Sequence, residues 1–145
     1  MDGLTIAVVG TEPDINILES MLAPQRSQIE HIDYAIDAIK ILKERQFPAI
    51  VTSLRVAPGE SHPITDGMIP NYAEIGCYMI RELRNQDSAN KKTPIFVNSV
   101  VHPSDDRSYP NAEARVLEAG ATAYFQTTTA GLKGLALAIR SHLSS

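Results

Sequence analysis

The chain has 145 residues, a length at which a single domain can bury a hydrophobic core of its own. Hydrophobic residues make up 43% of it and charged residues 21%, which excludes a disordered or fibrous chain. The net charge of −4 offers no basic surface for a phosphate backbone, since Lys91 and Lys92 are an isolated pair. We therefore predict one globular domain over residues 1–145 that does not bind nucleic acid directly.

The start of the chain differs from a secretory signal. Met1-Asp2-Gly3 is acidic where a signal peptide is basic, and the apolar run Leu4–Val9 is too short to span a membrane. Cys77 is the one cysteine and cannot form an internal disulfide, which is consistent with a reducing compartment. We expect a cytoplasmic protein that does not associate with membranes.

Strand signals and helix signals alternate along the chain. The first strand is predicted at Leu4–Val9, and a weaker one follows the next helical stretch at Ile29–Tyr34. Three later apolar runs have the length of buried parallel strands, at Ile50–Leu54, Pro94–Val101 and Ala121–Phe125. Each strand is followed by apolar residues at helical spacing: Ile15, Leu18 and Leu22; Ile36, Ile39 and Leu42; Ile75, Met79, Ile80 and Leu83; Ala112, Val116 and Ala119; Leu132, Leu135, Ile139 and Leu143.

This alternation favours right-handed crossovers and a parallel sheet that is covered on both faces. We expect an α/β fold of the doubly wound, flavodoxin-like kind, with five parallel strands in the order 2-1-3-4-5 and helices on both faces. Ligands of such sheets bind outside the carboxyl ends of the strands, where the winding reverses. The loops after the first, third, fourth and fifth strands are therefore where chemistry is expected.

Two loops at that edge are rich in turn-forming residues. Pro58–Glu74 is longer than the ~2–6 residues usual between a strand and a helix, and we interpret residues 58–74 as a loop insertion. A general acid or base could project from it, at His62 or Asp66 for example, although a solvated loop is the simpler interpretation. It could equally cover the pocket as a lid. The second loop is His102–Asn111.

Five segments stand out by their order and spacing. They are Val8-Val9-Gly10-Thr11-Glu12-Pro13, Pro48-Ala49-Ile50-Val51, Pro58-Gly59, Thr93-Pro94-Ile95 and Glu118-Ala119-Gly120-Ala121-Thr122-Ala123-Tyr124. Together they resemble the response-regulator receiver family over most of the chain, and the last segment is the most specific. The resemblance implies a receiver-like domain, in which two acids after the first strand hold magnesium beside a phospho-accepting aspartate.

The residues at the matching positions are not those that the family's chemistry needs. Gly10 and Thr11 fall at the acidic pair, which leaves Glu12 as the only acid there. The acceptor aspartate falls at Leu54, with Ser53 as the neighbouring choice, and neither is a carboxylate. This set forms a vestigial pocket rather than a phosphorylation site.

The family's lysine at the end of the fifth strand falls at Thr127, so the charge partner of the phosphoryl group is also missing. Phosphoryl transfer would then lack its metal site, its nucleophile and its electrostatic clamp together. We predict a pseudo-receiver with no catalytic residues, no bound metal and no cofactor. The four histidines match no close-spaced zinc pattern.

Two family positions keep their residue type. Ser99 is the hydroxyl residue that ends the fourth strand, and Tyr124 is the aromatic switch residue of the fifth. The resemblance implies a docking face made by the fourth helix, at Asn111–Ala119, the fifth strand and the fifth helix. The expected partner is another protein, a fused regulatory domain, or a second copy of this chain in a homodimer.

Plain structural roles compete with these assignments. Thr11 and Asp14 match a helix-capping pattern, and Glu12 suits the first turn of a helix. Ser99 can hydrogen-bond a loop backbone, and Tyr124 can be an ordinary core residue with its hydroxyl at the surface.

Two other functions stay open. One is a small enzyme that cleaves nucleotides or nucleosides, on a flavodoxin-like or Toll/interleukin-receptor-like fold, with Glu74 or Glu12 as its acid. The other is a receptor that binds a small molecule or anion with the loop amides around Gly10–Thr11 and the hydroxyl groups of Ser99, Thr127 and Thr128. The enzyme requires paired acids at a cleft, whereas the receptor does not.

Overall fold

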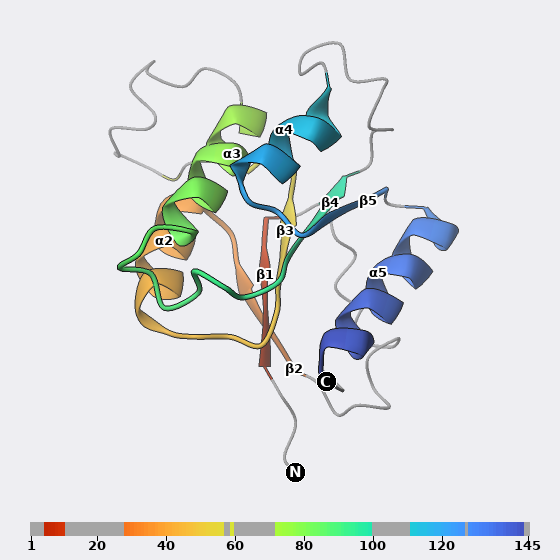
Figure 1. Cartoon of the computed structure of the whole chain (residues 1–145), viewed down its shortest axis with the longest axis horizontal. Helices are drawn as coiled ribbons and strands as arrows, with labels where there is room; N and C mark the ends of the chain where they lie inside the picture. The colour runs from red at the N-terminus through yellow and green to blue at the C-terminus, as the bar shows by residue number, and fades with distance from the viewer. Residues whose placement is uncertain are drawn as a thin grey trace.

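The computed structural model describes residues 5–10, 28–56, 59, 72–99, 111–126 and 128–143. A five-stranded sheet crosses the centre of the molecule in the order β2-β1-β3-β4-β5, and all four pairs of neighbouring strands are parallel (Figure 1). This confirms the predicted fold and strand order. The strands are β1 Thr5–Val9, β2 Gln28–Ile32, β3 Ile50–Ser53, β4 Ile95–Ser99 and β5 Ala123–Gln126.

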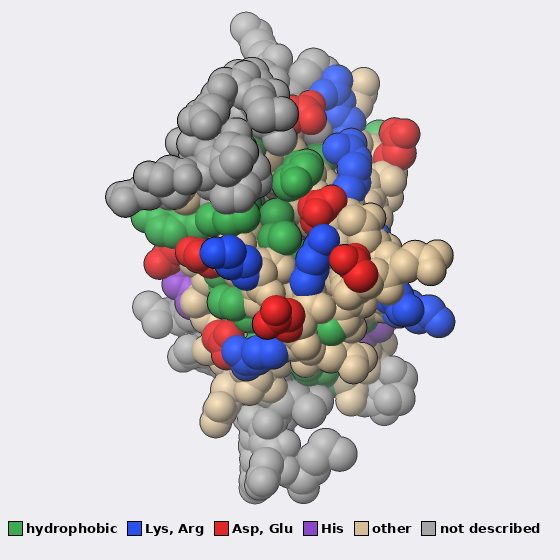
Figure 2. Space-filling view, turned by 90° about the vertical axis from the view of Figure 1, so that its left-hand side faces the viewer, with side chains coloured by type: hydrophobic (Ala, Val, Ile, Leu, Met, Phe, Trp, Pro, Cys, Tyr) green, Lys and Arg blue, Asp and Glu red, His purple; other side chains and the backbone are tan. Residues whose placement is uncertain are grey.

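Helices cover both faces of this sheet. In the described part of the chain, α2, α3 and α4 lie on one side, which is partly seen from outside in Figure 2, and α5 lies on the other (Figure 1). Their bounds are α2 Ala35–Glu44, α3 Tyr72–Leu83, α4 Ala112–Ala119 and α5 Thr129–Leu143. The first helix expected from the sequence lies outside the described residues, as do most of the 58–74 insertion and the loop at 102–110.

Side-chain alternation along the strands divides the core in two. Ile50 in β3 and Val97 in β4 face α2, α3 and α4, in a cluster that also holds Leu42, Ile80 and Val116. The neighbouring residue on each strand faces α5 instead: Val51 and Phe96 pack with Leu132, Leu135 and Ile139. Burial on both faces explains why the strands are continuous apolar runs in the sequence.

Several strands end one or two residues away from their predicted limits, for local reasons. The predicted strand Ile29–Tyr34 stops at Ile32, because Tyr34 is already the N-cap of α2. The predicted strand Ala121–Phe125 starts at Ala123, because the Ala121 amide still bonds the Val116 carbonyl of α4. Ser53 is the last residue of β3, and Leu54 lies in the bend that follows.

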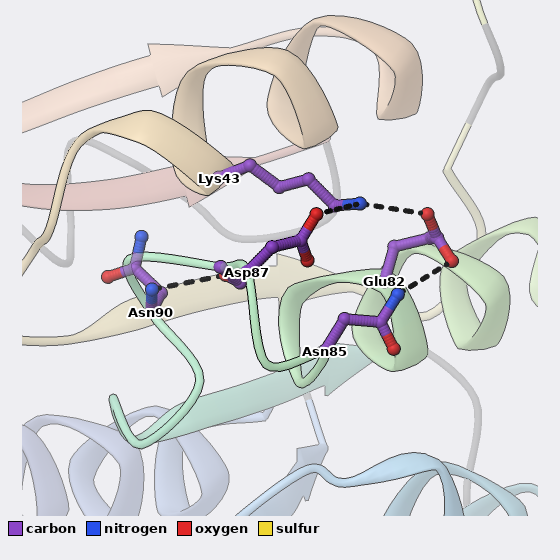
Figure 3. Close-up of polar contacts among 6 residues, drawn as sticks. Lys43, Glu82, Asn85, Asp87 and Asn90 are labelled. Carbon is purple, nitrogen blue, oxygen red and sulfur yellow. Dashed lines mark hydrogen bonds and ion pairs between the residues drawn. The ribbon is translucent and has the colours of Figure 1, made fainter.

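A side-chain network joins α2 to α3. The Lys43 ammonium lies 3.1 Å from a Glu82 carboxylate oxygen and 3.8 Å from Asp87, and Asn85 donates to the other Glu82 oxygen (Figure 3). The hydrogen bond to Glu82 raises the pKa of Lys43 above its usual value. The ion pair between Lys43 and Glu82 holds α2 and α3 together on the outer side of the larger core cluster.

The loop between α3 and β4 is held by two buried side chains. Asn90 is completely buried; its amide nitrogen donates to the carbonyls of Leu42 and Arg45, and its Oδ1 accepts the Phe47 amide at 2.9 Å. Arg84 donates to four backbone carbonyls, and its burial lowers its pKa. Together they fix the amino edge of the sheet.

Replacing Asn90 with alanine is expected to lower the free energy of unfolding by roughly 2–4 kcal/mol, because buried backbone groups would lose their partners. Asn85→Ala is the control: Asn85 is exposed, and its loss should change stability by no more than about 0.5 kcal/mol. Urea denaturation followed by circular dichroism measures both. Equal effects of the two changes would show that Asn90 does not hold this edge.

Candidate functional site

The carboxyl ends of the strands bring four of the predicted site residues to one edge of the sheet. Gly10 follows β1, Ser53 ends β3, Leu54 comes next, and Ser99 ends β4. In the strand register Ser53 pairs with Asn98, the residue before Ser99. All four are buried. Three further predicted pocket residues, Thr11, Glu12 and Thr127, lie outside the described residues.

Gly10 lies directly against Ser53. Its φ of +86° is a left-handed backbone conformation, which residues other than glycine rarely adopt. A Cβ atom at position 10 would also lie 2.5 Å from the Ser53 Oγ and 2.8 Å from its Cβ, closer than real contacts allow. Position 10 therefore has no room for a side chain unless Ser53 shifts.

The backbone of Gly10 is held from the neighbouring strand. Its amide donates to the Ile32 carbonyl at 2.9 Å, and His31 Nε2 lies 2.6 Å from the Gly10 carbonyl oxygen. The other ring nitrogen of His31 faces Asp33 Oδ1 at 3.5 Å. These contacts fix the turn after β1, so Gly10 cannot move away from Ser53 without breaking them.

Leu54, which the sequence resemblance matches to the acceptor position, is a buried hydrocarbon. Its exposed fraction is 1%, and it packs in the core cluster with Ile75 and Ile80 of α3. The backbone of α3 comes close enough at Gly76 that a Cβ atom there would overlap the Leu54 carbonyl oxygen. Helix α3 thus covers the end of β3, and the side chain of Leu54 offers no nucleophile.

Buried polar residues surround these positions. Thr52, Asn98 and Ser99 are completely buried. Thr52 donates to the Ser53 carbonyl at 3.1 Å, and Asn98 donates to the Phe125 carbonyl at 3.1 Å, which ties β4 to β5. Sequence reasoning missed Thr52 and Asn98. A polar residue inside an otherwise apolar strand was the signal that could have found them.

Tyr124 points into the molecule. Its exposed fraction is 9%, and it belongs to the core cluster that contains Val97 and Val116. Of the two roles considered for Tyr124 from the sequence, that of an ordinary core residue agrees with its position. On α4, Leu117 is an exposed large hydrophobic residue, with 41% of its surface accessible.

The candidate acid of the enzyme hypothesis that the structure describes is engaged in an ion pair. Glu74, one of the two candidate acids of the enzyme hypothesis, lies 3.2 Å from the Arg115 guanidinium. Among the described residues, no three histidine, cysteine, aspartate or glutamate side chains lie together as metal ligands would. Thr128, a candidate anion ligand, accepts the Gly131 amide at the start of α5 and serves as a helix cap.

No helix in the described part of the chain is long and apolar enough to cross a membrane.

No protein-family model and no curated protein matches the sequence. Solved structures of receiver domains do match. The receiver domain of a sensor histidine kinase from Pseudomonas aeruginosa, with a magnesium ion coordinated in its active-site cleft, is 20% identical with a TM-score of 0.67 and 99% of each chain covered. A histidine-kinase signal receiver domain from Clostridium thermocellum is 13% identical, with a TM-score of 0.71 over 100% of both chains.

A response-regulator receiver domain from Francisella is 14% identical, with a TM-score of 0.64 and 98% of each chain covered. The chain therefore has the receiver fold, and the resemblance inferred from the sequence is confirmed at the level of fold.

The contact between Gly10 and Ser53 can be tested by a double-mutant cycle. Gly10→Ala should lower the free energy of unfolding by roughly 2–5 kcal/mol, because backbone strain and overlap with Ser53 add together. In a Ser53→Gly background the same change should cost only roughly 1–3 kcal/mol, since the strain alone remains. Chemical denaturation of the four proteins gives the coupling energy. Identical costs in both backgrounds would show that the two residues do not touch.

Proposed function

We propose that this chain is a pseudo-receiver: a signalling module with the receiver fold that acts by binding another protein and is not phosphorylated. Leu54 is the observation that carries the proposal. A phosphoryl acceptor needs a nucleophilic oxygen that the donor can reach, and the matching position holds a buried hydrocarbon. The proposal also assigns the module to the cytoplasm, alone or fused to a regulatory domain.

The surroundings of Leu54 support the same conclusion. The magnesium ion of the Pseudomonas domain lies in its active-site cleft, and a hard divalent cation requires carboxylate or carbonyl oxygens. Here the place of one such carboxylate is filled by the contact between Gly10 and Ser53. Restoring a single acid would therefore not restore the site, because position 10 has no space for a side chain.

Incubation with acetyl phosphate and magnesium, followed by intact-protein mass spectrometry, tests the proposal. We expect no adduct of one phosphoryl group on this protein, under conditions that modify a receiver that retains its aspartate. The reason is that the position matched to the acceptor aspartate holds Leu54, whose side chain has no nucleophilic oxygen. A phosphoryl group found on Ser53 or on any carboxylate would refute phosphorylation-independent action.

The docking surface that we propose consists of α4, the free edge of β5 and α5. Strand β5 is the last strand of the sheet and pairs only with β4. Arg115 on α4 faces α3, where it meets Glu74, and Leu117 lies two residues further, about 200° around the helix. Leu117 is thus directed away from α3 and toward the β5 side, with 41% of its surface accessible.

Side chains of α3 and of Arg84, the residue that follows it, hold α4 in place. Arg115 meets Glu74 along α4, and the Arg84 side chain donates to the Gly120 carbonyl at its carboxyl end, at 2.9 Å. A helix fixed in this way presents Leu117 in one orientation, which lowers the entropy lost when a partner binds. Tyr124 supports α4 from inside the core rather than contacting the partner itself.

A photo-crosslinking amino acid at position 117, introduced in cells that produce the protein, should yield one dominant adduct with a partner. Mass spectrometry of the adduct then distinguishes a second copy of this chain from another protein. Position 34 is the matched control, since Tyr34 is also an exposed large hydrophobic residue, at 42%, but lies at the start of α2, outside the proposed surface. Adducts of equal yield from both positions, or none from 117, would contradict docking through α4.

A further inference from the structure

A second pocket lies at the opposite edge of the sheet, where β3 and β4 begin. It has a volume of about 410 Å³ and is lined by residues of the loops that precede these two strands. Those residues are Gln46, Phe47, Pro48, Ala89, Lys91, Lys92, Thr93 and Pro94. Pockets of roughly 300–1,000 Å³ are typical of small-molecule sites. Its lining includes no acidic side chain.

The two lysines of this pocket have no anionic partner among the described residues. Lys91 and Lys92 are both exposed, and neither lies within 4.0 Å of a carboxylate. Two cations nearby are neutralised: Lys43 meets Glu82, and Arg45 forms two hydrogen bonds to Glu30. The pocket therefore keeps its positive charge.

Arg84 adds a third positive charge behind the same loop. Its Nη1 donates to the carbonyl oxygens of Asn90, Lys91 and Thr93, at 3.1, 3.2 and 2.7 Å. Within the described residues the Arg84 guanidinium bonds carbonyl oxygens and no carboxylate, so these dipoles are what balances its charge. Because the guanidinium engages the three carbonyl groups, their negative ends do not oppose an anion bound by the loop.

The loop is also rigid, which a preformed binding site requires. Asn90 ties it to the end of α2 and to Phe47, and the Ala89 amide donates to the Lys43 carbonyl at 2.9 Å. Pro48 and Pro94 form part of the wall, each with a fixed backbone and an apolar ring. The pocket thus combines an apolar wall with a positive rim.

We propose that this pocket binds a small organic phosphate of about the size of a nucleoside monophosphate. The phosphate would lie between Lys91 and Lys92, and the organic body against Pro48 and Pro94. Inorganic phosphate alone would leave most of the 410 Å³ unfilled. The site lies at the other end of β3 from Ser53, so it is separate from the vestigial pocket and does not depend on the proposed docking function.

Calorimetric titration of the whole chain with AMP at low salt tests the site. We expect binding that weakens about tenfold or more in the double variant Lys91→Ala and Lys92→Ala, because two charge-assisted contacts are lost. The control is Lys40→Ala with Lys133→Ala, which removes the same net charge from exposed lysines elsewhere. It should change the affinity less than about twofold.

Three results would overturn the proposal. These are no binding of AMP to the unmodified chain at millimolar concentration, equal weakening in both double variants, or inorganic phosphate binding as tightly as AMP. Backbone NMR shifts provide the second readout. They should be largest at residues 46–48 and 89–94, and shifts concentrated at Gly10, Ser53 and Ser99 instead would assign the ligand to the other edge.

Discussion

A parallel sheet has to be covered on both faces, and the rest of this structure follows from that requirement. Strands β1, β3 and β4 are buried almost along their whole length, so helices must lie close on both sides. Close helices leave loops that turn sharply at the two edges of the sheet, and the backbone groups of those loops need partners. At the amino edge Asn90 and Arg84 supply them. At the carboxyl edge the backbone itself packs tightly, and glycine is the residue that fits at positions 10 and 76.

The tight packing at the carboxyl edge supports the proposal that receiver chemistry is absent. Gly10 and Ser53 fill the space in which a carboxylate would stand, and α3 covers Leu54 at Gly76. An acid placed at any one of these positions would be buried without a compensating charge, at a cost of several kcal/mol. The close packing at this edge therefore involves β1, β3 and α3 together. It is consistent with a domain whose function depends on its surface.

The fold could be predicted from the sequence because it depends on local signals. Apolar runs of strand length alternate with helical stripes, and this pattern alone indicates a doubly wound sheet. The match of Leu54 to the acceptor position could also be proposed from the sequence, since aligning Pro48 and Pro58-Gly59 with the family determines which residue falls there. The roles of Asn90 and Arg84 could not. Their partners lie up to 48 residues away in the chain, and a single polar residue in a loop gives no indication of such contacts.

The two edges of the sheet differ in charge, and Arg84 connects the amino edge to the end of the surface helix α4. In the described residues the carboxyl edge presents a glycine, hydroxyl groups, a leucine and, after β2, the acidic Asp33, whereas the amino edge carries Lys91 and Lys92. The Arg84 guanidinium bonds the loop that holds these lysines and also the Gly120 carbonyl at the end of α4. An anion that pulls on this loop would act on the same side chain that fixes α4. Because coupling between two sites is reciprocal, a partner bound at α4 would in turn change the affinity of the loop for the anion.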